Sequence, residues 1–249
     1  MFAFITSCIK ANKEIYDYVN HKLKSEDFVY HSEIGEGGDK SLNIDLYAES
    51  VFEKHLSCFG NIYSEESGFI KTTNENQKNN TIVIDPLDGS DNFMSSLPYY
   101  GTSVAFETQG DVKVGVVCNL VNGLIYIRDE NNNLKICDFD GNSVKDFVFD
   151  TRKSKTGIFE RSYAFPQVCN ILFGENLKYR SPGAVALSLA NARYYNFVLF
   201  IGSLREFDLK AALYICNDLY IYQNDKLLIV SKNKEIFFIL KKLLNNIRL

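Results

Sequence analysis

The order of apolar and polar residues along the chain predicts helices at the start and a run of strands after them. Apolar residues recur at helical spacing in about the first twenty residues and again in residues 45–59. From residue 81 the pattern changes to short apolar or alternating segments bounded by Gly, Asn and Asp, which is typical of an antiparallel meander. The predicted strands of this meander are residues 81–85, 102–108, 112–119, 123–130 and 134–140.

The second half of the chain mixes both kinds of pattern. Small and apolar residues in 183–193 predict a buried helix, and residues 194–201 form a strongly β-prone run. A helix over 207–216 follows, and the chain closes with two strands and a helix over 234–247. Runs of helix that alternate with runs of sheet indicate an α+β fold built as a layered sandwich.

Composition narrows the class of protein. A chain of 249 residues with 46% hydrophobic residues can bury a sizeable core. Its 27 Lys and Arg residues stand against 31 Asp and Glu, a net charge of -4 without a long run of either sign, so we expect neither a nucleic-acid nor a membrane partner. The six cysteines include no CxxC pair, which fits reduced thiols. Lys10 and Lys13 interrupt the apolar N-terminus before it reaches a spanning length, and we expect a cytoplasmic protein.

One short stretch, TIVIDPLDGSDNF at residues 81–93, concentrates acidic side chains directly after a strand-forming run. Carboxylates this close repel one another unless a cation or ligand lies between them. Pro86 cannot donate a ladder hydrogen bond, so we expect the strand to end there, with Asp85 at the end of the strand and Asp88 about one turn further on. Two such carboxylates facing one cavity suit a hard divalent cation such as Mg²⁺, which prefers oxygen ligands.

The residues after this acid pair favour an anion. Gly89 would let the backbone approach an anion closely, and a short helix beginning at Ser90 would point free N–H groups at a phosphate. The alternative is a simple turn, because Pro, Asp and Gly are the commonest turn residues. The motif alone leaves both readings open.

Two further acidic signals flank this motif along the chain. Glu65 and Glu66 follow a short β-prone run, and Asp208 begins an apolar helix. Adjacent acids are usually solvated surface, and an acid at a helix N-terminus is an ordinary favourable partner of the helix dipole. Each signal is weak alone, and the ordered set carries more information.

Taken in order, these motifs resemble the inositol monophosphatase family. That family belongs to the lithium-sensitive, magnesium-dependent phosphatases, with fructose-1,6-bisphosphatases and 3′-phosphoadenosine-5′-phosphate phosphatases. The matching motifs, with a Gly-Ala-Val-Ala helix before the last, are Glu65-Glu66, Asp85-Pro86-Leu87-Asp88-Gly89-Ser90 and Phe207-Asp208. The resemblance implies an αβαβα sandwich, a homodimer and a single phosphatase domain over residues 1–249. We expect two halves of this domain, a metal-binding α+β half 1–150 and a C-terminal α/β half 151–249.

The resemblance also implies roles for individual residues. Two or three Mg²⁺ ions are expected, one held by Glu65, Asp85 and the Leu87 carbonyl, and a second by Asp85, Asp88 and Asp208. Two ions of this kind activate a water molecule as the nucleophile. The expected catalytic residues are Asp45, Glu49, Glu66 and Ser90. The expected substrate contacts are Leu87, Asp88, Gly89, Ser90, Arg180 and Gly183. 

One catalytic role stays open between three acids. In the family, the hydroxyl that Ser90 matches is oriented by an acid from the region of the second helix. Asp45 is our first choice, Glu49 the second, and Asp39 in the glycine-rich loop is a third candidate.

Some positions depart from the family pattern. Phe207 replaces the usual Trp, and the acid that grips the sugar hydroxyls of inositol falls near Ile201 or Gly202. The motif DPLDGS is closer to the motif of the fructose-bisphosphatases. The last metal ligand expected here is Asp, however, whereas those enzymes have Glu. We therefore expect a Mg²⁺-dependent phosphomonoesterase acting on a small sugar or polyol phosphate. The alternatives are a fructose-1,6-bisphosphatase, a 3′-phosphoadenosine-5′-phosphate phosphatase, or, in another class, a weakly catalytic regulatory protein that binds a protein or RNA.

Overall fold

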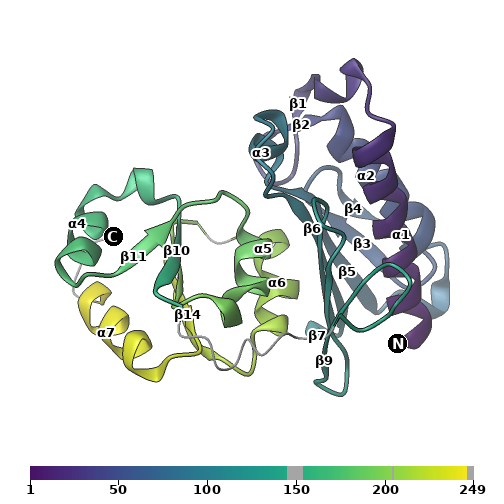
Figure 1. The fold of residues 1–249 in the computed structure, drawn as a ribbon. Coiled ribbons are helices and arrows are strands. Elements are labelled where there is room, and N and C mark those ends of the chain that lie inside the picture. Colours follow the sequence, from purple (N-terminus) through teal and green to yellow (C-terminus); the bar gives the residue numbers. More distant parts are fainter. Residues whose placement is uncertain (145–153, 204, 246–249) are drawn as a thin grey trace.

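The computed structural model describes residues 1–144, 154–203 and 205–245, which form five stacked layers (Figure 1). An outer pair of helices, a seven-stranded sheet, a middle pair of helices, a five-stranded sheet and a second outer pair of helices follow one another. The predicted αβαβα sandwich is therefore confirmed. The helices, from one outer layer to the other, are α1 (Phe2–His21), α2 (Asn43–Leu56), α5 (Val185–Ala190), α6 (Glu206–Ile215), α4 (Pro166–Gly174) and α7 (Lys234–Leu244).

The seven-stranded sheet contains the predicted meander. Its order is β4-β3-β5-β6-β7-β8-β9, and every neighbouring pair from β5 to β9 is antiparallel, as expected. β3 pairs with β5 in parallel, so the ends of these two strands lie at the same edge. The strands are β3 (Asn61–Ser64), β4 (Gly68–Ile70), β5 (Asn80–Asp88), β6 (Gly101–Thr108), β7 (Asp111–Asn119), β8 (Ile125–Arg128) and β9 (Leu134–Cys137).

The five-stranded sheet was only partly predicted. Its order is β11-β10-β12-β14-β13, in which β10 is parallel to both neighbours. The sequence patterns indicated β12 and the two closing strands but not β10, β11 or α4. The strands of this sheet are β10 (Thr156–Glu160), β11 (Lys178–Arg180), β12 (Val198–Ile201), β13 (Tyr220–Gln223) and β14 (Leu227–Ser231). A separate short hairpin pairs β1 (Tyr30–Ile34) with β2 (Lys40–Leu42).

The middle helices pack against both sheets. One apolar cluster joins Val117 of the seven-stranded sheet, Ala212 of α6 and Val230 of the five-stranded sheet. α6 lies very close to β7, because Gly115 has no side chain: a Cβ there would stand 2.5 Å from the carbonyl oxygen of Ala211. The packing of α6 on β7 therefore sets how near the start of α6 comes to β5.

Two expectations fall at the limits of the described chain. The boundary between the predicted halves 1–150 and 151–249 lies within residues 145–153, outside the described residues, so this division stays a prediction. The last predicted helix, 234–247, is observed from Lys234 to Leu244, and its final two residues also lie outside the described part. Within the described ranges, none of the helices has the length and apolar character needed to cross a membrane.

We expect Gly115→Ala to lower the free energy of unfolding by about 1–3 kcal/mol, the usual cost of an added methyl group in a packed core. The methyl would meet the backbone of α6, which cannot move without disturbing the middle layer. Urea unfolding of the metal-free protein measures the change. Gly174→Ala is the matched control, because an added Cβ at this helical glycine meets nothing within 4 Å. It should be neutral or slightly stabilising, and an equal loss in both variants would contradict the packing argument.

Candidate active site

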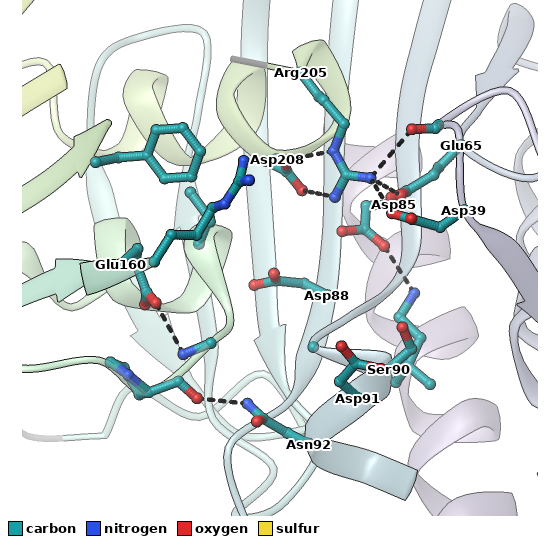
Figure 2. A pocket seen from close by; sticks show the side chains of 18 of the residues that line it. Asp39, Glu65, Asp85, Asp88, Ser90, Asp91, Asn92, Glu160, Arg205 and Asp208 are labelled. Atoms are coloured by element: carbon teal, nitrogen blue, oxygen red, sulfur yellow. Dashed lines mark hydrogen bonds and ion pairs between the residues drawn. The ribbon is translucent and has the colours of Figure 1, made fainter. Parts of the chain in front are cut away.

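A cavity of about 860 Å³ lies where the two sheets and the middle helices meet, and acidic side chains line it (Figure 2). Its walls come from the ends of β3, β5 and β10 and from the segments that precede α5 and α6. Residues far apart in the sequence therefore share one site.

β5 carries the acidic motif into this cavity. The strand does not end at Pro86 as expected but continues to Asp88, because a register shift in its pairing with β6 between Asp85 and Asp88 accommodates the proline. Asp85 Oδ1 accepts a hydrogen bond from the Leu87 N–H (2.9 Å), and Asp88 Oδ2 accepts one from the Leu187 N–H of α5 (2.9 Å). Both carboxylates are almost fully buried.

Glu65 and Asp208 join Asp85 from two other elements. Glu65 follows β3, whose parallel pairing with β5 brings its end beside Asp85, and its N–H donates to the Ile84 carbonyl (3.1 Å). Asp208 is the third residue of α6. One carboxylate oxygen from each of Glu65, Asp85 and Asp208 lies within 4.8 Å of the other two. The three acids expected from distant motifs therefore converge.

Burial makes this convergence costly for negative charge. Loss of solvent raises the pKa of Asp85 well above its ordinary value, and repulsion from Glu65 and Asp88 raises it further. Burial likewise raises the pKa of Glu65 to about 7, although Arg205 opposes the shift. Ionised carboxylates in such a place need positive charge beside them.

Arg205 supplies positive charge to this group. Its Nη1 lies 2.6 Å from Glu65 Oε1, its Nε lies 3.0 Å from Asp208 Oδ2, and its Nη2 donates to Asp208 Oδ1 at 3.2 Å. Figure 2 shows the guanidinium between these two carboxylates, with Asp39 on the same side as Glu65. These ion pairs of Arg205 were not predicted from the sequence.

The donor set fits a hard divalent cation. Every side chain of the converging trio offers carboxylate oxygen, the ligand type that Mg²⁺ prefers. One guanidinium offsets only part of the charge of Glu65, Asp85, Asp88 and Asp208. Asp88 is not part of the trio, but it lines the same cavity, and its Oδ2 accepts from α5.

The segment after the acids has the conformation that was predicted from Gly89 and Ser90. Gly89 has φ of +90°, which favours glycine, and α3 (Ser90–Met94) begins directly after it. Asn92, which sequence analysis missed, ties this helix to the opposite wall: its Nδ2 donates to the carbonyl oxygens of Tyr99 and Pro182, both at 2.7 Å. The loop before α5 is thereby held against α3.

The three candidates for orienting Ser90 lie in different places. Asp45 is buried and lines the cavity, and its Oδ2 accepts from the Leu42 N–H (2.7 Å) while its Oδ1 has no hydrogen-bond partner among the described residues. Burial raises its pKa to about 8. Glu49 does not line the cavity, because it accepts from the N–H (3.0 Å) and the hydroxyl (2.5 Å) of Ser67. Asp39 lines the cavity but is exposed and paired with Arg205.

The remaining expected residues are also divided. Glu66 lines the cavity and accepts a hydrogen bond from the Ser41 hydroxyl. Gly183 lines it as well, whereas Arg180 is exposed, donates to the Tyr179 carbonyl (2.8 Å) and is not among the lining residues. The structure thus brings together all the expected site residues except Glu49 and Arg180.

Glu160 is the most prominent buried cavity residue that sequence reasoning missed. It ends β10 and is 1% exposed, with Oε2 accepting from the Gly183 N–H (2.8 Å) and Oε1 from the Ser188 hydroxyl (2.5 Å). In Figure 2 it lies across the cavity from Glu65. The only signal in the sequence was an acid at the end of a short apolar run, the same arrangement that drew attention to Asp85.

Known proteins resemble the chain over most of its length. The sequence profile of the inositol monophosphatase family matches residues 43–218. The Nus factor SuhB of Escherichia coli is 25% identical over 202 residues, which are 76% of this chain and 72% of that protein. The fructose-1,6-bisphosphatase/inositol-1-monophosphatase of Methanocaldococcus jannaschii is 27% identical over 149 residues, 57% of this chain and 56% of that protein.

Solved structures share the fold. The extragenic suppressor protein suhB from Bartonella henselae superposes with a TM-score of 0.74 at 19% identity and covers 99% of both chains. The Thermotoga maritima IMPase superposes with a TM-score of 0.73 at 19% identity and covers 96% of both chains.

The names of the relatives concern a nucleic-acid partner, and the profile match concerns the family. The expectation that nucleic acid is not a partner finds no support, because relatives that align with 76% of the chain carry the name Nus factor. The family is clear, since the matched segment contains the whole acidic trio. The chain belongs to the inositol monophosphatase family.

Proposed function

We propose that this protein is a Mg²⁺-dependent phosphomonoesterase that hydrolyses a small sugar or polyol phosphate. The observation that supports it best is the approach of Glu65, Asp85 and Asp208 within 4.8 Å of one another in a cavity of about 860 Å³. A cavity of that size accommodates a small phosphorylated metabolite. Membership of a family that includes phosphatases supports the same activity.

The proposed cation ligands follow the family pattern. Glu65, Asp85 and the Leu87 carbonyl would hold one ion, and Asp85, Asp88 and Asp208 a second. Bound cations supply the positive charge that offsets the charge of a phosphate and activates water.

Other residues of the chain would place the substrate and move its protons. The first N–H groups of α3 have no partner one turn earlier in the helix, so Ser90 and Asp91 can offer theirs to a phosphate. Asp45 has a buried Oδ1 without a partner within the described ranges and a pKa near 8, so it is suited to accept and return a proton near neutral pH. We propose that Asp45, rather than Glu49, orients the Ser90 hydroxyl, because Glu49 is engaged by Ser67.

The identity of the alcohol that carries the phosphate is a separate part of the proposal. The position where inositol phosphatases have an acid for the sugar hydroxyls falls near Ile201, a buried apolar residue, and Gly202. Arg161, which also lines the cavity, offers a cation on that side. Fructose 1,6-bisphosphate and 3′-phosphoadenosine 5′-phosphate therefore stay as alternatives to a polyol monophosphate.

A second function deserves a test because of the relatives named Nus factors. The protein would then bind an RNA or protein partner and have little activity. RNA binding retained by a variant that lacks Asp85 would support this function, and absence of binding by the unmodified protein would count against it.

A substrate panel tests the first proposal. With Mg²⁺, we expect phosphate release from inositol 1-phosphate, fructose 1,6-bisphosphate or 3′-phosphoadenosine 5′-phosphate, inhibited by Li⁺ and lost when a chelator removes the cations. Measured kcat/KM values rank the substrates. Failure to release phosphate from any of them, or activity that survives chelation, would overturn the proposal.

Asp85→Asn should lower kcat/KM by more than about 100-fold, because loss of a direct cation ligand should exceed the 10–100-fold typical of residues that merely support ligands. Stability of the metal-free protein should not fall, since the substitution removes charge repulsion in a buried place. Asp111→Asn is the control, an exposed acid on β7 that does not line the cavity. Undiminished turnover by Asp85→Asn would sink the assignment.

Asp45→Asn should lower activity yet stabilise the metal-free protein, increasingly so as pH rises. The pKa of Asp45 is raised from 3.8 to about 8 in the folded state, so its stabilising contribution is full below about pH 4 and is lost as pH rises through 8. Asn cannot ionise and can still accept from Leu42. Urea unfolding with a chelator should show a gain over wild type at least about 1 kcal/mol larger at pH 8 than at pH 5.

The control for this pH effect is Asp27→Asn. Asp27 is also buried but lies outside the cavity, and its oxygens accept from the Tyr18 hydroxyl and the Lys24 N–H. This variant should gain no stability at pH 8. A pH-independent effect of Asp45→Asn would contradict the prediction.

A further inference from the structure

Arg205 occupies the space between two carboxylates that the proposed cation also needs. One guanidinium contacts Glu65 through Nη1 and both oxygens of Asp208 through Nε and Nη2. Paired contacts of this kind between a guanidinium and a carboxylate are among the stronger hydrogen-bonded ion pairs. The oxygens that would coordinate a cation are therefore already engaged by this chain itself.

The Arg205 nitrogen that contacts Glu65 has two further partners in the glycine-rich loop. Nη1 also lies 3.3 Å from Asp39 Oδ2 and donates to the Gly37 carbonyl at 3.4 Å. Arg205 stands directly before α6, three residues from Asp208, so the helix fixes where its side chain begins. The side chain is 34% exposed, which leaves it a route toward solvent.

A bound divalent cation and this guanidinium are hard to accommodate together. Both would rest against Glu65 and Asp208, and two positive groups a few ångströms apart repel each other beside carboxylates that are mostly buried. The cation also requires lone pairs that point at the guanidinium in this structure. Binding of one therefore weakens binding of the other.

We propose that Arg205 is an internal counter-ion that competes with a divalent cation for Glu65 and Asp208, so that its guanidinium must leave both carboxylates when the cation binds. The metal-free protein then keeps its buried acids partly neutralised. The apparent affinity for the cation is reduced by the fraction of molecules in which Arg205 blocks the site. This inference rests on the cation site of the proposed function.

Other cations of the cavity do not share this position. Lys40 and Arg161 also line it, yet neither forms an ion pair with Glu65 or Asp208 within the described ranges. Arg161→Gln removes the same charge from the same cavity without removing these contacts. It is the matched control for Arg205→Gln.

Calorimetric titration of Mg²⁺ into chelator-treated, metal-free protein tests the proposal without using activity. If the guanidinium blocks the site in about nine molecules of ten, Arg205→Gln should bind Mg²⁺ about tenfold more tightly than wild type. Arg205→Lys, which keeps the charge but loses the paired contacts, should bind with intermediate affinity. This second variant keeps the proposal testable if Arg205→Gln fails to fold. Arg161→Gln should bind less than threefold more tightly, on the order of the effect of charge alone.

Two further measurements separate competition from general electrostatics. Asp39→Asn removes an outer contact of Arg205 and should tighten Mg²⁺ binding, whereas loss of a merely attractive negative charge would weaken it. Metal-free Arg205→Gln should melt below wild type, and saturating Mg²⁺ should raise its melting temperature more than that of wild type.

The outcomes distinguish this inference from the proposed function. Mg²⁺ binding by Arg205→Gln and Arg205→Lys that is no tighter than wild type overturns the competition, while the phosphatase proposal stands. Absence of Mg²⁺ binding in every variant overturns both.

Discussion

The repulsion between buried carboxylates is the constraint on which this structure depends. Glu65, Asp85 and Asp208 come from a turn after β3, a strand and a helix that belong to different parts of the chain. Burial disfavours their charged forms and raises the pKa of each of them. A fold gains no stability from such an arrangement, so the site makes sense only where positive charge enters it.

The layered architecture keeps these acids together despite that cost. α5 is held from both sides, since the Leu187 N–H donates to Asp88 of the seven-stranded sheet while Glu160 of the five-stranded sheet accepts from Gly183 just before the helix. α6 approaches the first sheet closely because Gly115 lacks a side chain. The middle layer is thus both the core of the sandwich and the support of the cavity.

Local patterns predicted what is local. The meander and most helices follow from periodicity, and the strand, turn and short helix around Asp85 follow from residues within one segment. β10 and β11 were not predicted, because they are short and gain their stability from neighbours distant in the chain. The same reason explains the site: Asp45 and Glu49 lie one turn apart on α2, but only the tertiary position of Ser67 decides that Glu49 turns away from the cavity.

Similarity to proteins named Nus factors raises the question of whether the acids serve chemistry or are incidental to a binding function. A protein that acted only through an outer surface would lose nothing by replacing Asp85 with a neutral side chain and would become more stable. Asp45 Oδ1, which is buried and has no hydrogen-bond partner in the part of the chain that the structure describes, adds a second unfavourable feature to the same cavity. Two independent costs in one place favour a site for cation and phosphate chemistry, whatever partner the outer surface binds.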